Sequence, residues 1–179
     1  MPGRIDATIP FRALRIAVLT VSDSRTAADD RSGDVLVERL TAAGHELAAR
    51  ALVRDELDAI VAQLRAWIAD PVVEVVITTG GTGVTGGDVT PEALARVAEK
   101  HIAGFGELFR MLSYQKIGTS CLQSRADAAV ARGTHLFCLP GSPRARRGGW
   151  GGILPFPLGI RPRPCYFAEL MPRLREHEG

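Results

Sequence analysis

The sequence predicts an α/β fold whose largely parallel central sheet is covered by helices on both faces. Short apolar runs rich in β-branched residues alternate with helical patterns over the first hundred residues, and the chain has no internal repeat. Alternating strands and helices build βαβ units, in which consecutive strands are parallel. The length of 179 residues suits one domain. We assign residues 1–13 to an N-terminal extension and residues 14–179 to a single α/β domain.

Five strands are expected. Leu14–Val21 and Val72–Thr79 are apolar and β-branched, as buried strands usually are, and His45–Arg54 lies between them. Helices separate these three strands, so we expect them to be parallel. The other two strands, on either side of Gly133, are Ala126–Arg132 and Thr134–Leu139.

Helical patterns follow the first two strands. Leu36 and Leu40 lie four residues apart, and Gly44 stands just after them, where glycine often ends a helix. The second helix begins near Asp55 or Asp58, carries apolar residues at helical spacing and ends at an Asp-Pro dipeptide.

Two more helices are expected after the third strand. Thr90-Pro91-Glu92 offers an N-cap, a proline at the first helical position and an acidic first turn. The fourth helix has a long apolar face for so small a domain, and we expect part of that face to pack between subunits. The residues on this face are Phe105, Leu108, Phe109 and Leu112.

Composition excludes several classes of protein. A net charge of +2 is too small to indicate nucleic acid or an anionic membrane as the main partner. The cysteines Cys121, Cys138 and Cys165 form no C-x-x-C pair, which argues against a disulfide framework or a structural zinc site. The sequence shows neither a signal peptide nor an apolar run long enough to cross a bilayer. We therefore expect a cytoplasmic protein whose cysteines are buried apolar residues.

Polar residues follow three of the predicted strands. Ser22–Ser24 follow the first, Asp55 the second and Thr79–Asp88 the third. Ligands of open parallel sheets bind at the carboxyl ends of the strands. Each segment alone is compatible with an ordinary capped turn, but their convergence at one sheet edge predicts a ligand site.

The glycine-rich loop matches G-x-G-x-x-G over Gly81–Gly86. A dinucleotide site is disfavoured, because that fingerprint follows the first strand and opens a helix, whereas here the helix begins only at Thr90. A Walker A loop is excluded, because no Lys-Ser or Lys-Thr follows the glycines. We interpret the loop as a phosphate cradle of backbone N–H groups, with the hydroxyls of Thr79, Thr82 and Thr85 nearby.

Asp88 ends this loop just before a helix, where aspartate often serves as a turn or cap residue. The alternative pairs it with Asp55. Two carboxylates at neighbouring strand ends, beside a phosphate cradle, are the usual way to hold Mg²⁺ on a nucleotide. The sequence leaves both interpretations open.

Three stretches, in this order, resemble the molybdopterin-binding family of molybdenum cofactor biosynthesis, which includes the MoaB and MogA types. They read TTGGTGVTGGDVTPEAL, GFGELFRMLSYQKIGTS and SRADAAVARGTHLFCLPGS. The resemblance runs from about Arg15 to Ser142 and is weaker beyond. It implies a three-layer α/β/α sandwich, the molybdopterin-binding domain fold, that assembles into homotrimers or homohexamers.

The resemblance also implies a chemistry. MogA-type members bind molybdopterin and Mg·ATP and transfer AMP to the terminal phosphate of the pterin, releasing pyrophosphate; a separate molybdenum-insertion protein uses the product. Because anionic phosphates repel one another, such a reaction needs a metal, backbone dipoles and positioning rather than a protein nucleophile. The alternatives are a non-catalytic molybdopterin-binding or scaffold protein of the same pathway and a nucleotide hydrolase of the CinA type.

The functional aspartates of the family fall on Asp55 and Asp88, which would be catalytic and hold Mg²⁺. Its substrate- and phosphate-binding positions fall on Ser22, Thr79, Gly80, Gly81, Thr82, Gly83, Pro140, Gly141 and Ser142.

The chain departs from the family over residues 140–164, where 12 of 25 residues are Gly or Pro and none is acidic. Family members continue there into an amphipathic helix, in which each glycine costs about 1 kcal/mol relative to alanine. The segment is an irregular surface tail, a short and distorted last helix, or a place where the recorded sequence is locally wrong. The replacement of polar and acidic positions by Gly, Pro and Arg favours the last of these.

Overall fold

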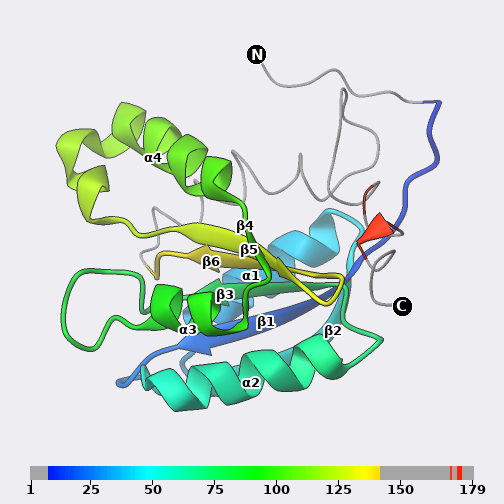
Figure 1. Cartoon of the computed structure of the whole chain (residues 1–179), viewed down its shortest axis with the longest axis horizontal. Helices are drawn as coiled ribbons and strands as arrows, with labels where there is room; N and C mark the ends of the chain where they lie inside the picture. Colours follow the sequence, from blue (N-terminus) through cyan, green and yellow to red (C-terminus); the bar gives the residue numbers. More distant parts are fainter. Residues whose placement is uncertain (1–7, 142–169, 171–172, 175–179) are drawn as a thin grey trace.

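The computed structural model describes residues 8–141, 170 and 173–174. Within them, six strands form one sheet in the order β2-β1-β3-β6-β5-β4 (Figure 1). The first four of these are parallel neighbours, β5 is antiparallel to β6, and β4 is antiparallel to β5. The predicted largely parallel sheet is confirmed. The strands are β1 (Arg15–Val21), β2 (Glu46–Val53), β3 (Val75–Thr79), β4 (Lys100–His101), β5 (Asp127–Ala131) and β6 (Thr134–Leu139).

The helices cover both faces of this sheet. Two apolar clusters show which helix covers which face, because α1 and α4 contribute to one cluster and α2 and α3 to the other. The three-layer α/β/α sandwich is therefore confirmed. The helices are α1 (Arg31–Ala42), α2 (Leu57–Ala69), α3 (Thr90–Val97) and α4 (Ala103–Ile117), with a 3₁₀ helix, η1 (Gly118–Gln123), directly after α4.

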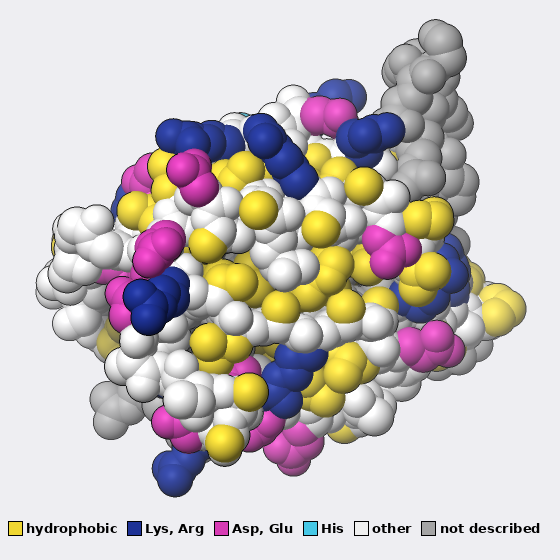
Figure 2. All heavy atoms as spheres, turned by 90° about the horizontal axis from the view of Figure 1, so that it is seen from below, with side chains coloured by type: hydrophobic (Ala, Val, Ile, Leu, Met, Phe, Trp, Pro, Cys, Tyr) yellow, Lys and Arg dark blue, Asp and Glu magenta, His cyan; other side chains and the backbone are white. Residues whose placement is uncertain are grey.

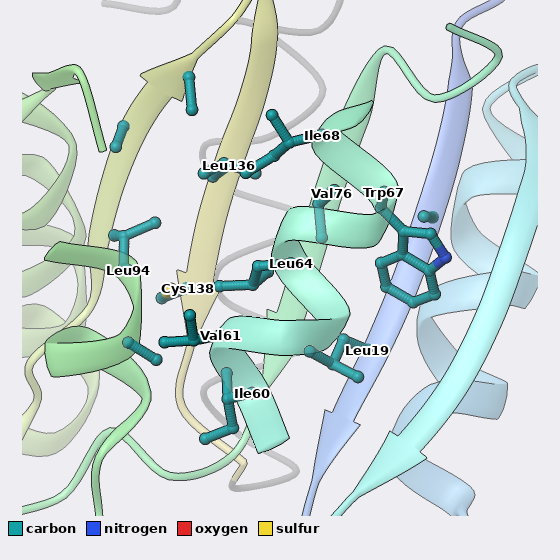
Figure 3. Packing of buried hydrophobic residues seen from close by; sticks show 14 of the residues in the cluster. Leu19, Ile60, Val61, Leu64, Trp67, Ile68, Val76, Leu94, Leu136 and Cys138 are labelled. Carbon is teal, nitrogen blue, oxygen red and sulfur yellow. The ribbon is translucent and has the colours of Figure 1, made fainter. Parts of the chain in front are cut away.

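Alternation along the strands divides the core into its two halves. On β1, Val18 faces the α1 and α4 side and Leu19 faces the α2 and α3 side, as the period of two along a strand requires. Figure 3 shows the second half, in which Leu64 and Trp67 of α2 lie over Leu19 and Val76 of the sheet.

The first predicted elements match the observed ones within a few residues. Helix α1 begins inside the polar stretch, because the buried side chain of Asp30 caps it by accepting the Gly33 N–H at 2.9 Å. Gly44 ends it as expected, with a φ of +86°. The third strand begins at Val75 and not at the predicted Val72, which lies exposed in the preceding turn.

One expectation about the later helices is wrong. Thr90 is the first residue of α3 and not its N-cap, since its hydroxyl donates to the carbonyl of Gly80 at 2.9 Å. In α4, Phe105 and Phe109 are buried, but Leu108 is 40% exposed and turns away from the core. The short strand β4 has no counterpart in the sequence prediction, because two residues carry no periodic pattern.

The cysteines, the helices and the surface charge were also the subject of sequence predictions. Cys121 and Cys138 are buried free thiols, whereas Cys165 and most of the segment 140–164 lie outside the described residues. No helix in the described ranges is long and apolar enough to span a membrane. On the α2 side (Figure 2), charged side chains of both signs surround a band of hydrophobic ones and do not form one basic patch.

Candidate functional site

The predicted site residues meet where neighbouring parallel strands end. The Ser22 N–H, just after β1, donates to the Val53 carbonyl at the end of β2 at 2.9 Å. The Gly80 N–H, just after β3, donates to the Leu139 carbonyl at the end of β6 at 3.1 Å. The loops that follow these strands therefore start from one edge of the sheet. The predicted convergence is confirmed.

Two glycines let the loop after β3 pass close to its neighbours. Gly80 and Gly81 have φ values of +102° and +63°, a region that L side chains rarely adopt. A Cβ on Gly80 would lie 2.1 Å from the Val21 carbonyl oxygen. One on Gly81 would lie 2.3 Å from Thr90 Oγ1 and 2.8 Å from both carboxylate oxygens of Asp55. The fold itself therefore requires glycine at both positions.

Asp55 lies partly buried between the loop after β1 and the start of α3. Its Oδ1 accepts the Val89 N–H at 3.1 Å, and its own N–H donates to Asp23 Oδ1 at 2.9 Å. Burial raises the pKa of Asp55, and the charges of Asp88, Asp23 and Glu92 raise it further, against the lowering effect of the Val89 N–H. The site thus holds a carboxylate whose ionisation is opposed by its surroundings.

Asp88 lies on the other side of the loop and closes a turn with Thr85. The Thr85 N–H donates to Asp88 Oδ2 at 2.9 Å, and the Thr85 hydroxyl donates to the same oxygen. This hydroxyl lowers the pKa of Asp88, as do the N–H groups of Thr85 and Gly83 and the charge of Arg125, against the raising effect of burial. The interpretation of Asp88 as a turn residue is confirmed, and it leaves the metal interpretation open.

The two carboxylates suit a magnesium ion that a nucleotide helps to hold. The charge of Asp88 raises the pKa of Asp55, and both carboxylates lie against glycines of the same loop. Nowhere in the described ranges do three or more His, Cys, Asp or Glu side chains cluster to bind a metal alone. Mg²⁺ needs no such cluster, because it usually takes one or two carboxylates together with substrate phosphates and water. The donor set therefore fits.

The remaining predicted residues lie around this loop. Thr79 is 1% exposed, and its hydroxyl makes no hydrogen bond within the described part of the chain. Ser22 Oγ accepts the Ser24 N–H at 3.4 Å in a local turn. Gly141 approaches the loop so closely that a Cβ on it would lie 3.1 Å from Gly80 Cα. Pro140 precedes it, and Ser142 lies outside the described residues.

The sequence prediction missed Arg125, which binds the loop most extensively. Its Nε donates to the Gly83 carbonyl at 2.6 Å, and its two terminal nitrogens donate to the Asp88 carbonyl and to Glu92. Its backbone N–H donates to the Thr82 carbonyl at 3.1 Å. The residue lies in the SRAD stretch, where a charged residue just before a buried strand was the one available signal.

Arg125 also lines an open groove of about 420 Å³. The walls of this groove come from the start of α3, from α4 and η1, and from the residues that lead into β5. The polar residues among them include Glu107, Arg110, Ser124, Arg125 and Asp127.

Comparison with known proteins identifies the family of this chain. The family model described as "Probable molybdopterin binding domain" matches residues 17–158. Molybdenum cofactor biosynthesis protein B of Escherichia coli (strain K12) is 50% identical over 157 residues, covering 88% of this chain and 92% of that protein. The protein of the same name from Bacillus subtilis (strain 168) is 44% identical over 133 residues, covering 74% and 78%.

Solved structures agree with the sequence matches. A crystal structure of Molybdenum cofactor biosynthesis protein B has a TM-score of 0.83 at 35% identity, covering 93% of this chain and 98% of that one. The tungsten cofactor synthesizing protein MoaB from Pyrococcus furiosus has a TM-score of 0.71 at 32% identity, covering 78% and 89%. The match in sequence and in fold thus covers most of the chain, and this chain belongs to the molybdopterin-binding domain family.

Proposed function

We propose that this protein acts in molybdenum cofactor biosynthesis by binding molybdopterin and transferring AMP from Mg·ATP to its terminal phosphate. The observation that supports this most is the pair Asp55 and Asp88, which lie against one glycine-rich loop at the ligand-binding edge of the sheet. The family match and the name of the Escherichia coli relative point to the same pathway.

The proposed step needs no protein nucleophile. An oxygen of the pterin phosphate attacks the α-phosphorus of ATP, the bond between the α-phosphorus and its bridging oxygen breaks, and pyrophosphate leaves. Asp55 and Asp88 would bind Mg²⁺, which when bound offsets the negative charge of the phosphate oxygens. The backbone N–H groups of the loop would orient the phosphates.

Positioning accounts for the rest of the proposed catalysis. Two anionic substrates held in one orientation react as parts of a single complex, which removes much of the entropic barrier. Asp55 would bind Mg²⁺ only when its carboxyl is ionised. Because the pKa of this carboxyl is raised, we expect metal binding to be lost toward acidic pH.

We further propose that the protein is a homotrimer or homohexamer assembled through the outward face of α4. Leu108, Met111 and Tyr114 lie on this helix and are 40%, 57% and 59% exposed, and Leu122 of the adjoining η1 is 76% exposed. Large apolar side chains grouped at one surface typify interfaces between subunits.

The function is tested by incubating the purified protein with molybdopterin, ATP and Mg²⁺. The expected result is pyrophosphate release together with an adenylylated pterin detected by mass spectrometry. Binding of molybdopterin without turnover would instead support a non-catalytic binding protein of the pathway. Pyrophosphate or phosphate release from ATP without the pterin would support a nucleotide hydrolase.

A further inference from the structure

The side chain of Arg125 joins the two ends of an exposed loop tip. Its Nε binds the Gly83 carbonyl at 2.6 Å, and a terminal nitrogen binds the Asp88 carbonyl. Between these carbonyls, Val84 is 66% exposed, and a Cβ added to Gly86 or Gly87 would meet nothing within 4 Å. The tip thus has little packing of its own, and Arg125 connects its two ends by binding the Gly83 and Asp88 carbonyls.

Arg125 also binds the two peptide groups that face the candidate catalytic carboxylates. In a trans peptide the C=O and N–H point in opposite directions. The Asp88 carbonyl accepts from Arg125, and the N–H of the same peptide, that of Val89, donates to Asp55 Oδ1 at 3.1 Å.

The second peptide repeats this arrangement. The Thr82 carbonyl accepts the Arg125 N–H at 3.1 Å, and the N–H of the same peptide, that of Gly83, lies beside the Asp88 carboxylate. A Cβ on Gly83 would lie 2.6 Å from Asp88 Oδ2, so carboxylate and backbone are in close contact here.

We infer that Arg125 is a positioning residue. Its guanidinium locates Asp55 through the peptide between Asp88 and Val89 and also binds the Gly83 carbonyl, and its backbone N–H binds the peptide between Thr82 and Gly83 that faces Asp88. The inference rests on the function proposed above. Arginine suits the task because its planar guanidinium presents several donors in a fixed geometry, whereas a lysine ammonium cannot reach two separated carbonyls in the same way. A third contact, with the Glu92 carboxylate, holds the guanidinium in place.

Arg125→Lys is the test, because it keeps the positive charge and the backbone N–H that binds the Thr82 carbonyl, and removes the planar guanidinium that binds the Gly83 and Asp88 carbonyls. In the protein alone, amide hydrogen exchange of residues 82–89 is expected to become faster, with little change elsewhere. Mg²⁺-dependent binding of a non-hydrolysable ATP analogue is expected to need about 10-fold more Mg²⁺, since residues that orient metal ligands affect metal affinity to this extent. The kcat of adenylyl transfer is expected to fall about 100-fold with a smaller change in KM for molybdopterin.

Arg110→Lys is the matched control. Arg110 lines the same groove, but its hydrogen bond at 3.4 Å goes to the Ser124 carbonyl and not to the loop. This variant is expected to match the wild type in loop exchange and in Mg²⁺ dependence.

Two outcomes overturn the inference. In one, Arg125→Lys lowers Tm and speeds exchange throughout the protein while the Mg²⁺ requirement of the folded fraction is unchanged, which describes a structural residue only. In the other, loop exchange and Mg²⁺ requirement both equal those of the wild type. Failure of the proposed function is seen separately, as a wild-type protein that forms no adenylylated pterin, and the exchange and Mg²⁺ measurements judge Arg125 in that case too.

Discussion

Asp55 and Arg125 are hydrogen-bonded to opposite ends of one peptide group, that between Asp88 and Val89. The Val89 N–H donates to Asp55 Oδ1 at 3.1 Å, and the Asp88 carbonyl accepts from the Arg125 guanidinium. Asp55, Asp88 and Arg125, from separate parts of the chain, are thus connected through one peptide group at the edge of the sheet.

Asp88→Asn is expected to lower adenylyl transfer by about 100-fold or more, because loss of a metal-binding carboxylate removes stabilisation of the charged transition state. The turn should survive, since the amide oxygen of asparagine can still accept the Thr85 N–H. Steady-state kinetics and a melting curve measure the two effects. Asp58→Asn is the control, because Asp58 is 95% exposed and pairs with Arg96 away from the loop. Unchanged turnover in Asp88→Asn would leave Asp88 as a turn residue alone.

At acidic pH, the loss of Mg²⁺-dependent ATP-analogue binding is expected to follow the protonation of Asp55. Its pKa is raised by burial and by neighbouring carboxylates, whereas hydrogen bonds from Thr85 lower that of Asp88. Asp23→Asn removes one neighbouring charge and still offers an oxygen to the Asp55 N–H. The acidic limb of Mg²⁺-dependent ATP-analogue binding should then move to lower pH. A limb that stays in place would assign it to another group.

Unfolding free energy is expected to fall as the pH decreases below about 6.5, because burial lowers the pKa of His135 to about 4. The unfolded chain binds a proton in this range and the folded chain does not, so stability is full above the unfolded pKa and is lost on acidification. The loss approaches about 3 kcal/mol near pH 4. Urea titrations at several pH values measure it. His135→Leu should flatten this dependence, and an unchanged slope in that variant would exclude His135 as its source.

Met111→Glu is expected to weaken assembly by placing a charge on the outward apolar face of α4. Light scattering at micromolar concentration should show a trimer or hexamer for the wild type and a smaller mass for this variant. Val72→Glu is the control, since Val72 is similarly exposed at 46% but lies in the turn before β3. A monomeric wild type would contradict assembly through this face.

Gly81→Ala and Gly86→Ala are expected to differ in stability. Gly81 has a φ of +63° and a Cβ there would meet Thr90 and Asp55, so alanine should destabilise the protein by more than about 1 kcal/mol. Gly86 has open space around it, and alanine there should leave the melting temperature almost unchanged. Equal melting temperatures for the two variants would show that the loop adjusts freely at Gly81.

Elements that have a clear local pattern are predictable from the amino-acid sequence alone. The β-branched runs around Leu19 and Ile77 and the helical spacing of Leu36 and Leu40 predicted strands and a helix, because each half-buried element repeats its apolar residues with its own period. The convergence of Asp55 and the glycine-rich loop was predictable for a related reason, since both follow strands whose carboxyl ends share one edge.

Contacts that cross between elements depend on how the chain packs and not on any local pattern. Arg125 is 42 residues from Gly83 and 37 from Asp88, and no local pattern relates them. The exposure of Leu108 likewise depends on what lies opposite α4, which helical periodicity alone does not specify. The opposite pKa shifts of Asp55 and Asp88 arise in the same way, because burial and hydrogen-bond partners belong to the packed chain and not to either residue.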